Sequence, residues 1–555
     1  MLSRLSVSRG FRSSFRQCAL STSAPASTHV PSWSTIDPST AGLTSPMIPT
    51  MNLVNGEWTS AASRSMVIPD PLRASKEGLA TVPLVQSDEL GPFINSLKSV
   101  PKTGLHNPLK NVDRYVALGD ISSKAGDALA DPEIQDYFAK CIQRCMPKSY
   151  AQCRAEVAVT AAFLKNFSSD NVRFLCGNDF GVTGDYDGQV SRGYRWPYGP
   201  VCIIAPFNFP LEIPVLQLMG ALFMGNKPVL KPAEKVSFVM EQFIRLLVDC
   251  GMDPKDVDLL NCEGPVVGEL IEKGGVRVTQ FTGSSRVAEL LSEQTRGKVK
   301  IEDAGFDWKI LGPDVGDVDY VAWQCDQDAY AASGQKCSAQ SILFAHDNWM
   351  EAGIVDKVGD LANNRKLDDL TVGPIMTHTT ADMKRHIDDL LTIPGAKILW
   401  GGKELDDHDI PDCYGAMEPT AVFVPLKEMM KPENFDRATT EFFGPFQVVT
   451  SYADEDIDTV LEALERMSHH LTAAVVSNDV SFQHKVLGNS VNGTTYTGRR
   501  ARTTGAPQNH WFGPAGDPRG CGIGSKEAIK MVWSCHREIV SDSLVPEGWT
   551  RPPPT

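Results

Sequence analysis

The chain has 555 residues, of which 42% are hydrophobic and 22% are charged, and its formal net charge is −15. This length exceeds what one hydrophobic core supports, so it predicts two or three domains of a soluble globular kind. The acidic balance disfavours nucleic acid as the main partner, because an acidic surface repels the phosphate backbone.

The first 36 residues differ in composition from the rest of the chain. They contain four arginines and many serines, and the first acidic residue is Asp37. An Arg-rich, Ser-rich and acid-poor start is typical of an organelle transit peptide. We therefore predict a leader over residues 1–36 that directs the chain to the mitochondrial matrix, with a plastid as the less favoured destination and a disordered basic tail as the alternative.

The cysteines indicate a reduced intracellular compartment. There are 13 of them, with no regular framework and no Cys-x-x-Cys pair. Cys141 and Cys145 lie four residues apart on a predicted helix, but no histidine lies near them in the sequence. We therefore expect no bound metal.

The first half of the chain predicts a helical segment followed by alternating strands and helices. Residues 107–167 are expected to be mostly helical, with Leu109, Val112 and Val116 at helical spacing. Strands are expected at "VCIIA", "KPVL", "RVTQFTGS" and "KVKIEDAG", and a helix that Ser237 can cap and Gly251 can end at "SFVMEQFIRLLVDCG". This alternation over residues 199–305 predicts a parallel sheet of the Rossmann type.

The apolar stretch from 199 to 225 is not a membrane span. Four prolines fall between positions 200 and 214, together with Asn208 and Glu212. Prolines at this density break a spanning helix, so a buried strand, a turn and a helix fit better. We expect no membrane partner.

After Gly305 the alternation restarts. Strands are expected at "SAQSILFAH", "TAVFVPL", "GPFQVVTSY" and "TAAVVSN", with helices near residues 349–361 and 454–466. The sequence therefore predicts a second α/β unit. The late segment "RGCGIGS" lacks the Gly-x-Gly-x-x-Gly spacing, and we interpret it as a mobile loop that does not cradle phosphate.

Three residues could carry chemistry. Cys337 lies in "AASGQKCSAQS", among small and polar residues that leave room for a substrate. Glu302 ends a predicted parallel strand, where active sites of open α/β sheets gather. Asn208, held between prolines in "APFNFP", could donate a hydrogen bond. Each taken alone is equally well explained as a structural residue.

Together, these segments resemble the aldehyde dehydrogenase superfamily over residues 50–545. Seven motifs occur in the family's order: "PFNFP", "LKPAE", "GPVVGELI", "FTGSSRVAELL", "IEDAG", "GQKCSA" and "EFFGPF". The resemblance implies a Rossmann-type cofactor domain, an α/β catalytic domain and a small β oligomerisation element.

The resemblance implies that Cys337 adds to the aldehyde carbon as the nucleophile. The Asn208 amide and the Cys337 backbone N–H would hold the oxyanion. Glu302 would act as the general base that activates water to hydrolyse the thioester. Asp303 beside it departs from the family's Glu-Leu-Gly-Gly, and Phe207 replaces the usual tryptophan.

The resemblance also implies an NAD site. Lys231 and Glu234 would hold the adenine ribose, and a carboxylate there favours NAD over NADP because it repels a 2′-phosphate. The remaining residues that the resemblance assigns to the cofactor are Ile204, Phe207, Gly264, Gly268, Gly283, Ser284, Glu441 and Phe443.

The nucleophile segment is most similar to the delta-1-pyrroline-5-carboxylate dehydrogenases, particularly the plant-type mitochondrial form. These enzymes oxidise L-glutamate γ-semialdehyde to L-glutamate. Lys336 and Ser338 would suit the substrate's α-carboxylate, and Gly513, Pro514 and Ala515 would form a further anchoring loop. The alternatives are another NAD-linked semialdehyde dehydrogenase and a non-catalytic protein of this fold.

The resemblance implies four parts of the chain and a homo-oligomer, either a dimer or a tetramer. The leader comprises residues 1–36, the NAD-binding domain 50–176 and 198–305, and the catalytic domain 306–490. An oligomerisation hairpin comprises 177–197, and residues 491–555 hold the substrate loop and a C-terminal strand.

Overall fold

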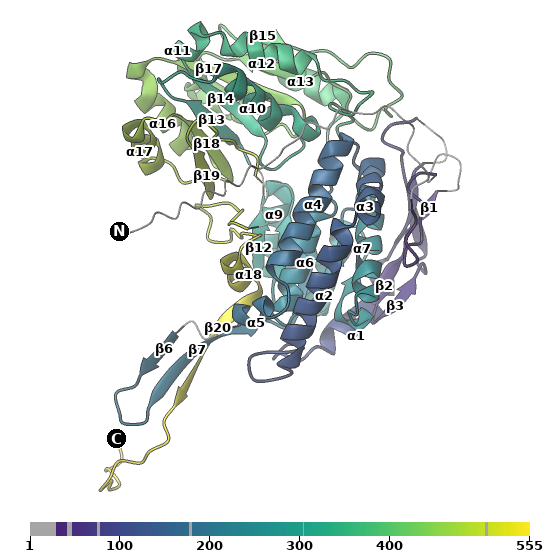
Figure 1. Ribbon diagram of the computed structural model, residues 1–555, viewed down its shortest axis with the longest axis vertical. Helices are drawn as coiled ribbons and strands as arrows, with labels where there is room; N and C mark the ends of the chain where they lie inside the picture. Colours follow the sequence, from purple (N-terminus) through teal and green to yellow (C-terminus); the bar gives the residue numbers. More distant parts are fainter. Residues whose placement is uncertain (1–28, 41–46, 75–77, 177–179, 304, 506–508) are drawn as a thin grey trace, which may run out of the picture.

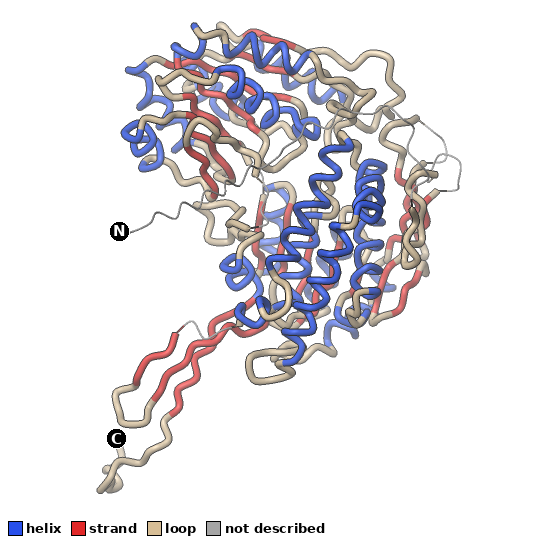
Figure 2. The backbone as a smooth tube through the Cα atoms, in the orientation of Figure 1, coloured by secondary structure: helices blue, strands red, loops and turns tan. Residues whose placement is uncertain are grey.

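The structure is a computed structural model that describes residues 29–40, 47–74, 78–176, 180–303, 305–505 and 509–555. Two α/β units lie next to each other, each built on a seven-stranded sheet, and a three-stranded arm projects from the molecule (Figure 1). Helices lie on both sides of the strands in each unit (Figure 2). No helix in the described ranges is long and apolar enough to span a bilayer.

The first sheet is the one that the alternation over residues 199–305 predicts. Its strand order is β12 (Val299–Glu302), β11 (Thr279–Thr282), β8 (Pro200–Ile204), β9 (Lys227–Lys231), β10 (Asp258–Leu259), β2 (Asn52–Val54) and β3 (Glu57–Thr59). The strands from β12 to β10 are parallel, whereas β2 and β3 are antiparallel additions. All five residues of β8 are buried because helices cover both faces.

Two groups of helices cover this sheet. One face carries α6 (Glu212–Phe223) and α7 (Ser237–Asp249), under α2 (Asp113–Ala130), α3 (Pro132–Cys145) and α4 (Tyr150–Asn166). The other face carries α1 (Gly91–Lys98), α8 (Gly264–Lys273) and α9 (Ser285–Thr295). Val201 and Ile203 face the first group, while Cys202 and Ile204 face the second, as the alternation of side chains along a strand requires.

The second sheet confirms the restarted alternation. Its order is β15 (Lys397–Trp400), β16 (Thr420–Phe423), β17 (Phe446–Tyr452), β14 (Gln340–His346), β13 (Asp307–Leu311), β18 (Thr472–Val476) and β19 (Thr494–Thr497). Only β15 runs antiparallel to its neighbour among these described strands. The helix expected near 349–361 is divided into α11 (Asp347–Glu351) and α12 (Ile354–Asn363), because Gly353 has a φ of +75°.

The other helices of this unit lie on the two faces of its sheet. One face carries α10 (Val318–Tyr330) together with α12. The opposite face carries α13 (Thr380–Leu391), α14 (Leu426–Met429), α15 (Pro432–Ala438), α16 (Ile457–Arg466) and α17 (Val480–Gly488). The edge strand β19 belongs to this sheet, so the second unit continues beyond residue 490, the boundary expected from the sequence.

The arm consists of β6 (Phe180–Thr183), β7 (Val190–Pro197) and β20 (Ser534–Ser541), which pair antiparallel in the order β20-β7-β6. It projects from the unit built on the first sheet, where α5 (Asn171–Leu175) and α18 (Lys526–Trp533) lie at its base (Figure 1). A separate small sheet, β1 (Ile48–Pro49), β5 (Ala80–Leu84) and β4 (Arg64–Ile68), lies at the other side of the molecule.

The last residues of the predicted leader contact the folded body. Residues 1–28 lie outside the described part, but residues 29–36 pack against the body. The Trp33 ring lies 5.6 Å from Tyr137 and 5.8 Å from Phe138, between ring centroids. The backbone N–H of Thr35 donates to Gln242 at 3.1 Å. The segment after residue 28 is therefore part of the folded body and not a disordered extension.

Two helix details also differ from the sequence prediction. Leu109 and Val112 are exposed and precede α2, whose buried face instead includes Tyr115 and Leu118. Ser237 does not cap α7. It is the first residue of that helix, and its hydroxyl bonds to Asn261 at 2.5 Å.

Candidate active site

Four strand ends of the first sheet bring the predicted residues to one edge. Ile204 ends β8 and is followed by Phe207 and Asn208, Lys231 ends β9, and Glu302 ends β12. After β11 come Gly283 and Ser284, and Ser284 is the N-cap of α9. Because the carboxyl ends of parallel strands meet at the same edge, the cofactor and catalytic candidates converge there.

The turn before the nucleophile has an unusual backbone. Ala332, Ser333 and Gly334 have φ values of +55°, +56° and +67°. A side chain at Gly334 would clash with the backbone of Gly444, since an added Cβ would lie 1.9 Å from its oxygen. Gln152 holds the Ala332 N–H at 3.0 Å, which helps to fix a conformation that L-residues rarely adopt.

Cys337 and Glu302 come from different units and meet between them. Burial raises the pKa of Glu302 to about 7, and the nearby Cys337 thiol opposes that rise. Burial and the Glu302 carboxylate raise the pKa of the Cys337 thiol well above its usual value. Neither carboxyl oxygen of Glu302 has a hydrogen-bond partner among the described residues. The carboxyl group is therefore free to accept a proton.

Asn208 is buried, and its amide donates to the backbone oxygen of Gln335 at 3.1 Å. The second amide proton remains for another acceptor, since a side-chain amide has two. Gln335 is itself fixed, because Met376 N donates to it at 2.7 Å and it donates to Pro374 at 2.9 Å. The orientation of the Asn208 amide is thus set by the nucleophile segment.

The residues assigned to the cofactor form contacts that suit a dinucleotide. The ammonium of Lys231 pairs with Glu234 at 2.5 Å. An added Cβ at Gly268 would lie 2.4 Å from Gln294, so glycine lets α8 approach α9, whereas Gly264 borders open space. The site therefore fits a nicotinamide cofactor, with the ion pair at a strand end and the N-terminus of α9 beside it.

The nicotinamide end is expected near two aromatic rings. Phe207 and Phe443 come from different units, and their ring centroids lie 6.0 Å apart. Burial raises the pKa of Glu441 to about 8, and the backbone N–H of Gly305 opposes that rise. Glu441 also adds to the raised pKa of Cys337, which places the carboxyl group near the nucleophile.

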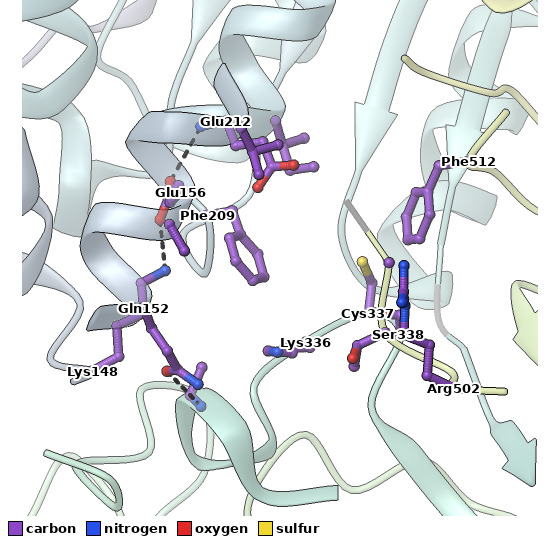
Figure 3. A pocket seen from close by; sticks show the side chains of 16 residues that line it. Lys148, Gln152, Glu156, Phe209, Glu212, Lys336, Cys337, Ser338, Arg502 and Phe512 are labelled. Carbon is purple, nitrogen blue, oxygen red and sulfur yellow. Dashed lines mark hydrogen bonds and ion pairs between the residues drawn. The ribbon is translucent and has the colours of Figure 1, made fainter. Parts of the chain in front are cut away.

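A pocket of about 320 Å³ opens onto the nucleophile (Figure 3). Cys337, Lys336 and Ser338 line one side of it. The remaining lining residues come from α4 and its approach, from α6 and its approach, from the nucleophile turn and from the segment after β19: Lys148, Gln152, Ala155, Glu156, Val159, Phe209, Glu212, Ile213, Ala332, Arg502, Thr504, Gly505 and Phe512.

The predicted substrate loop does not line this pocket, and its role in substrate binding stays a prediction. Gly513, Pro514 and Ala515 are absent from its lining, although the preceding Phe512 is present. The Ala515 N–H instead donates to the His470 backbone oxygen at 3.1 Å.

The "RGCGIGS" segment is a loop, as expected, but its backbone pairs with β12. The N–H of Ile301 donates to the Arg519 oxygen, and the N–H of Cys521 donates to the Ile301 oxygen, at 3.0 Å each.

Sequence reasoning missed residues on both walls of the pocket. Glu212 counted only against a membrane span, and Arg502 had no predicted role. The available signals were weak: one acid in an apolar segment, and the basic run "GRRAR" after a predicted strand. Both side chains reach the pocket only through tertiary packing.

Comparison with known proteins places this site in a family. The aldehyde dehydrogenase family profile matches residues 117–532. The mitochondrial delta-1-pyrroline-5-carboxylate dehydrogenase 12A1 of Arabidopsis thaliana is 58% identical over 508 residues, which cover 91% of this chain and 90% of that protein.

Solved structures share the fold. An NAD-dependent aldehyde dehydrogenase from Sinorhizobium meliloti matches with a TM-score of 0.77 and 19% identity, over 91% of this chain and 97% of that one. A complex of NADP with the NADP-dependent glyceraldehyde-3-phosphate dehydrogenase of Bacillus halodurans C-125 matches with a TM-score of 0.75 and 22% identity, over 89% and 100%. The chain described here belongs to the aldehyde dehydrogenase family.

Proposed function

We propose that the protein oxidises L-glutamate γ-semialdehyde, the open form of 1-pyrroline-5-carboxylate, to L-glutamate with NAD, as a step of proline breakdown. The observation that carries this proposal is the pocket in which Cys337 lies between Lys336 and Ser338. The 58% identity to a pyrroline-5-carboxylate dehydrogenase supports it. A small-molecule aldehyde is thus the substrate class.

Each step has a residue in place. Cys337 adds to the aldehyde carbon as its thiol proton is lost to water, so Glu302, whose carboxyl is unpartnered and has a pKa of about 7, is left to act in hydrolysis. The second N–H of the Asn208 side-chain amide and the backbone N–H of Cys337 donate hydrogen bonds to the oxyanion and so stabilise it. The bound nicotinamide cofactor supplies the hydride acceptor. Glu302 then takes a proton from the water that hydrolyses the Cys337 thioester.

Glu234 supports NAD over NADP. Its carboxylate can accept hydrogen bonds from both ribose hydroxyls, and it repels a 2′-phosphate. Because one of the two structural relatives is named as NAD-dependent and the other as NADP-dependent, fold similarity alone leaves this choice open. Glu234→Ser removes both effects, so we expect the KM for NAD to rise and use of NADP to increase. Wild-type protein that already prefers NADP would contradict the assignment.

We infer that the protein forms a homo-oligomer through the arm and acts in the mitochondrial matrix. The arm and the segment after it expose large apolar side chains, namely Val182, Tyr186, Val540, Leu544, Val545 and Trp549. Such a cluster on a projecting sheet suits an interface with another copy. The Arabidopsis relative is named as mitochondrial, in agreement with the Arg-rich start of this chain.

A substrate panel with NAD tests the function. Initial rates are compared for 1-pyrroline-5-carboxylate, succinic semialdehyde and propanal. We expect the highest kcat/KM for the first, because the other two lack an α-amino acid group for the pocket to bind. A higher value for succinic semialdehyde would support the alternative, another NAD-linked semialdehyde dehydrogenase. No oxidation of any aldehyde would support a non-catalytic role.

A further inference from the structure

One buried carboxyl group in the pocket has no role in the chemistry above. Glu212 is the first residue of α6, and every residue of that helix is buried. Glu212 is only 6% exposed, and its Oε1 has no hydrogen-bond partner among the described residues. An unpartnered buried acid is costly, so its presence in an otherwise apolar helix calls for a function.

Glu156 lies next to Glu212, but both of its carboxyl oxygens have partners. Glu156 pairs with Lys148 at 2.7 Å, and its other oxygen accepts the backbone N–H groups of Leu211 at 2.9 Å and Glu212 at 3.2 Å. Lys148 also donates to the Asn208 backbone oxygen at 3.0 Å. Glu156 thus holds the start of α6 in place, while the Glu212 carboxyl is left to face the pocket.

The two pocket walls carry an acidic and a basic side chain, respectively. Glu212 lies on the helical wall, across from Cys337, Ser338 and Arg502 (Figure 3). No carboxylate among the described residues pairs with Arg502 or with Lys336. Burial and the Glu156 carboxylate raise the pKa of Glu212 to about 8, while Lys148 and Lys336 oppose that rise. An incoming cation would stabilise the Glu212 carboxylate in the same way.

We propose that Glu212 binds the α-ammonium group of the substrate and so selects α-amino semialdehydes over semialdehydes that lack the amine. This inference rests on the proposed function and deepens it. The α-carboxylate would lie toward Ser338, Lys336 and Arg502, so the two walls match the two charges of an amino acid. Glutaric semialdehyde has the same chain without the amine, and it is the substrate that the site should reject.

The first test compares two substrates in Glu212→Gln, which keeps the shape of the side chain and removes its charge. We expect kcat/KM for glutamate γ-semialdehyde to fall about 10- to 150-fold, the usual effect of a lost hydrogen bond to a charged group. The value for glutaric semialdehyde should stay within about twofold or rise. Glu272→Gln, at an exposed acid of α8, serves as the charge control and should change neither value.

Two results would overturn the proposal. Equal losses for both substrates would mean that Glu212 is the counter-charge of Lys336 or carries a proton for catalysis. No loss for either would mean that the ammonium binds elsewhere. Glu212→Asp keeps the charge and should retain part of the preference for the amino substrate, which a purely steric role would not produce.

A second test needs no variant to fold and no oxidation of glutamate semialdehyde. L-Glutamate and glutarate are compared as inhibitors of propanal oxidation by the wild-type enzyme. We expect L-glutamate to bind at least about tenfold more tightly, because only it carries the ammonium group. Equal inhibition would overturn the role of Glu212. Failure of the wild type to oxidise glutamate semialdehyde would instead count against the proposed function, so the two failures are distinguishable.

Discussion

Glu302 shows how one buried carboxyl group can serve as a base near neutral pH. Its pKa is raised to about 7 because burial penalises the charged form. A raised pKa means that the group gains a proton as the pH falls through 7, and a protonated carboxyl cannot accept one from water. The wild-type steady-state rate should therefore fall below pH 7.

Glu302→Gln tests this role. The amide cannot accept the proton, so hydrolysis of the Cys337 thioester should slow by about 10²- to 10⁴-fold. Rapid-mixing absorbance should show a single burst of NADH followed by slow turnover, without the pH dependence near 7. An unchanged steady state would assign the base role to another group, such as Asp303.

Ser338 is the residue whose substitution separates carboxylate recognition from chemistry. Ser338→Ala removes one hydrogen bond to the substrate's α-carboxylate, so kcat/KM for glutamate semialdehyde should drop about 10- to 150-fold. Propanal has no carboxylate and should be oxidised nearly as fast as by the wild type. Equal losses with both aldehydes would indicate a disturbed Cys337, and no loss would remove Ser338 from the binding site.

At the scale of elements, the sequence pattern does not predict strand β13, because two charged residues lie within it. Asp307 and Lys309 interrupt its short apolar pattern, yet both are fully buried. Lys309 is accommodated because Asp328 on α10 pairs with it at 2.7 Å. The neighbouring strands β14, β17 and β18 could be predicted, since their apolar runs are continuous. The local sequence pattern around Lys309 does not reveal that Asp328, 19 residues later, will neutralise its charge.

The same Asp328 holds the segment after β19 that lines the pocket. It accepts the Thr503 N–H at 2.8 Å, the Thr504 hydroxyl at 2.7 Å and the Gln324 amide at 2.9 Å. Asp328→Asn should lower the free energy of unfolding by about 3–5 kcal/mol, because it leaves the Lys309 charge buried without its partner. Arg502 should also become less well positioned, so the KM for the semialdehyde should rise.

The control for this variant lies on the same helix. Asp319 of α10 pairs with Lys357, and its side chain is 90% exposed. Asp319→Asn should leave denaturant unfolding and the KM unchanged, as expected of a surface pair. Similar effects of the two substitutions would show that the buried pair does not stabilise the pocket segment.

At the scale of the whole molecule, the order of the seven motifs predicted the two units and their meeting at Cys337 and Glu302. The pocket could not be predicted in the same way, because it is assembled from α4, α6 and the segment after β19. The loop at residues 513–515 illustrates the difference. Motif position suggested a role in substrate binding, whereas packing places Phe512, Arg502 and Thr504 at the pocket instead.

The start of the folded body makes a further prediction. Trp33 packs on Tyr137 and Phe138, and Thr35 and Gln242 exchange two hydrogen bonds. A chain that begins at Asp37 should therefore be less stable than one that begins at Val30, by about 1–3 kcal/mol. Urea unfolding of both proteins measures the difference. Equal stability would mean that this contact contributes nothing and that the predicted leader could extend to residue 36.

The central claim is that Cys337 carries the substrate through oxidation, and Cys337→Ala tests it most directly. NADH formation is followed with NAD and 1-pyrroline-5-carboxylate, and NAD binding is measured on the same protein by calorimetry. We predict no aldehyde-dependent NADH while NAD still binds, because the thiol lies outside the adenine site. Aldehyde-dependent NADH formation near the wild-type rate would contradict the account.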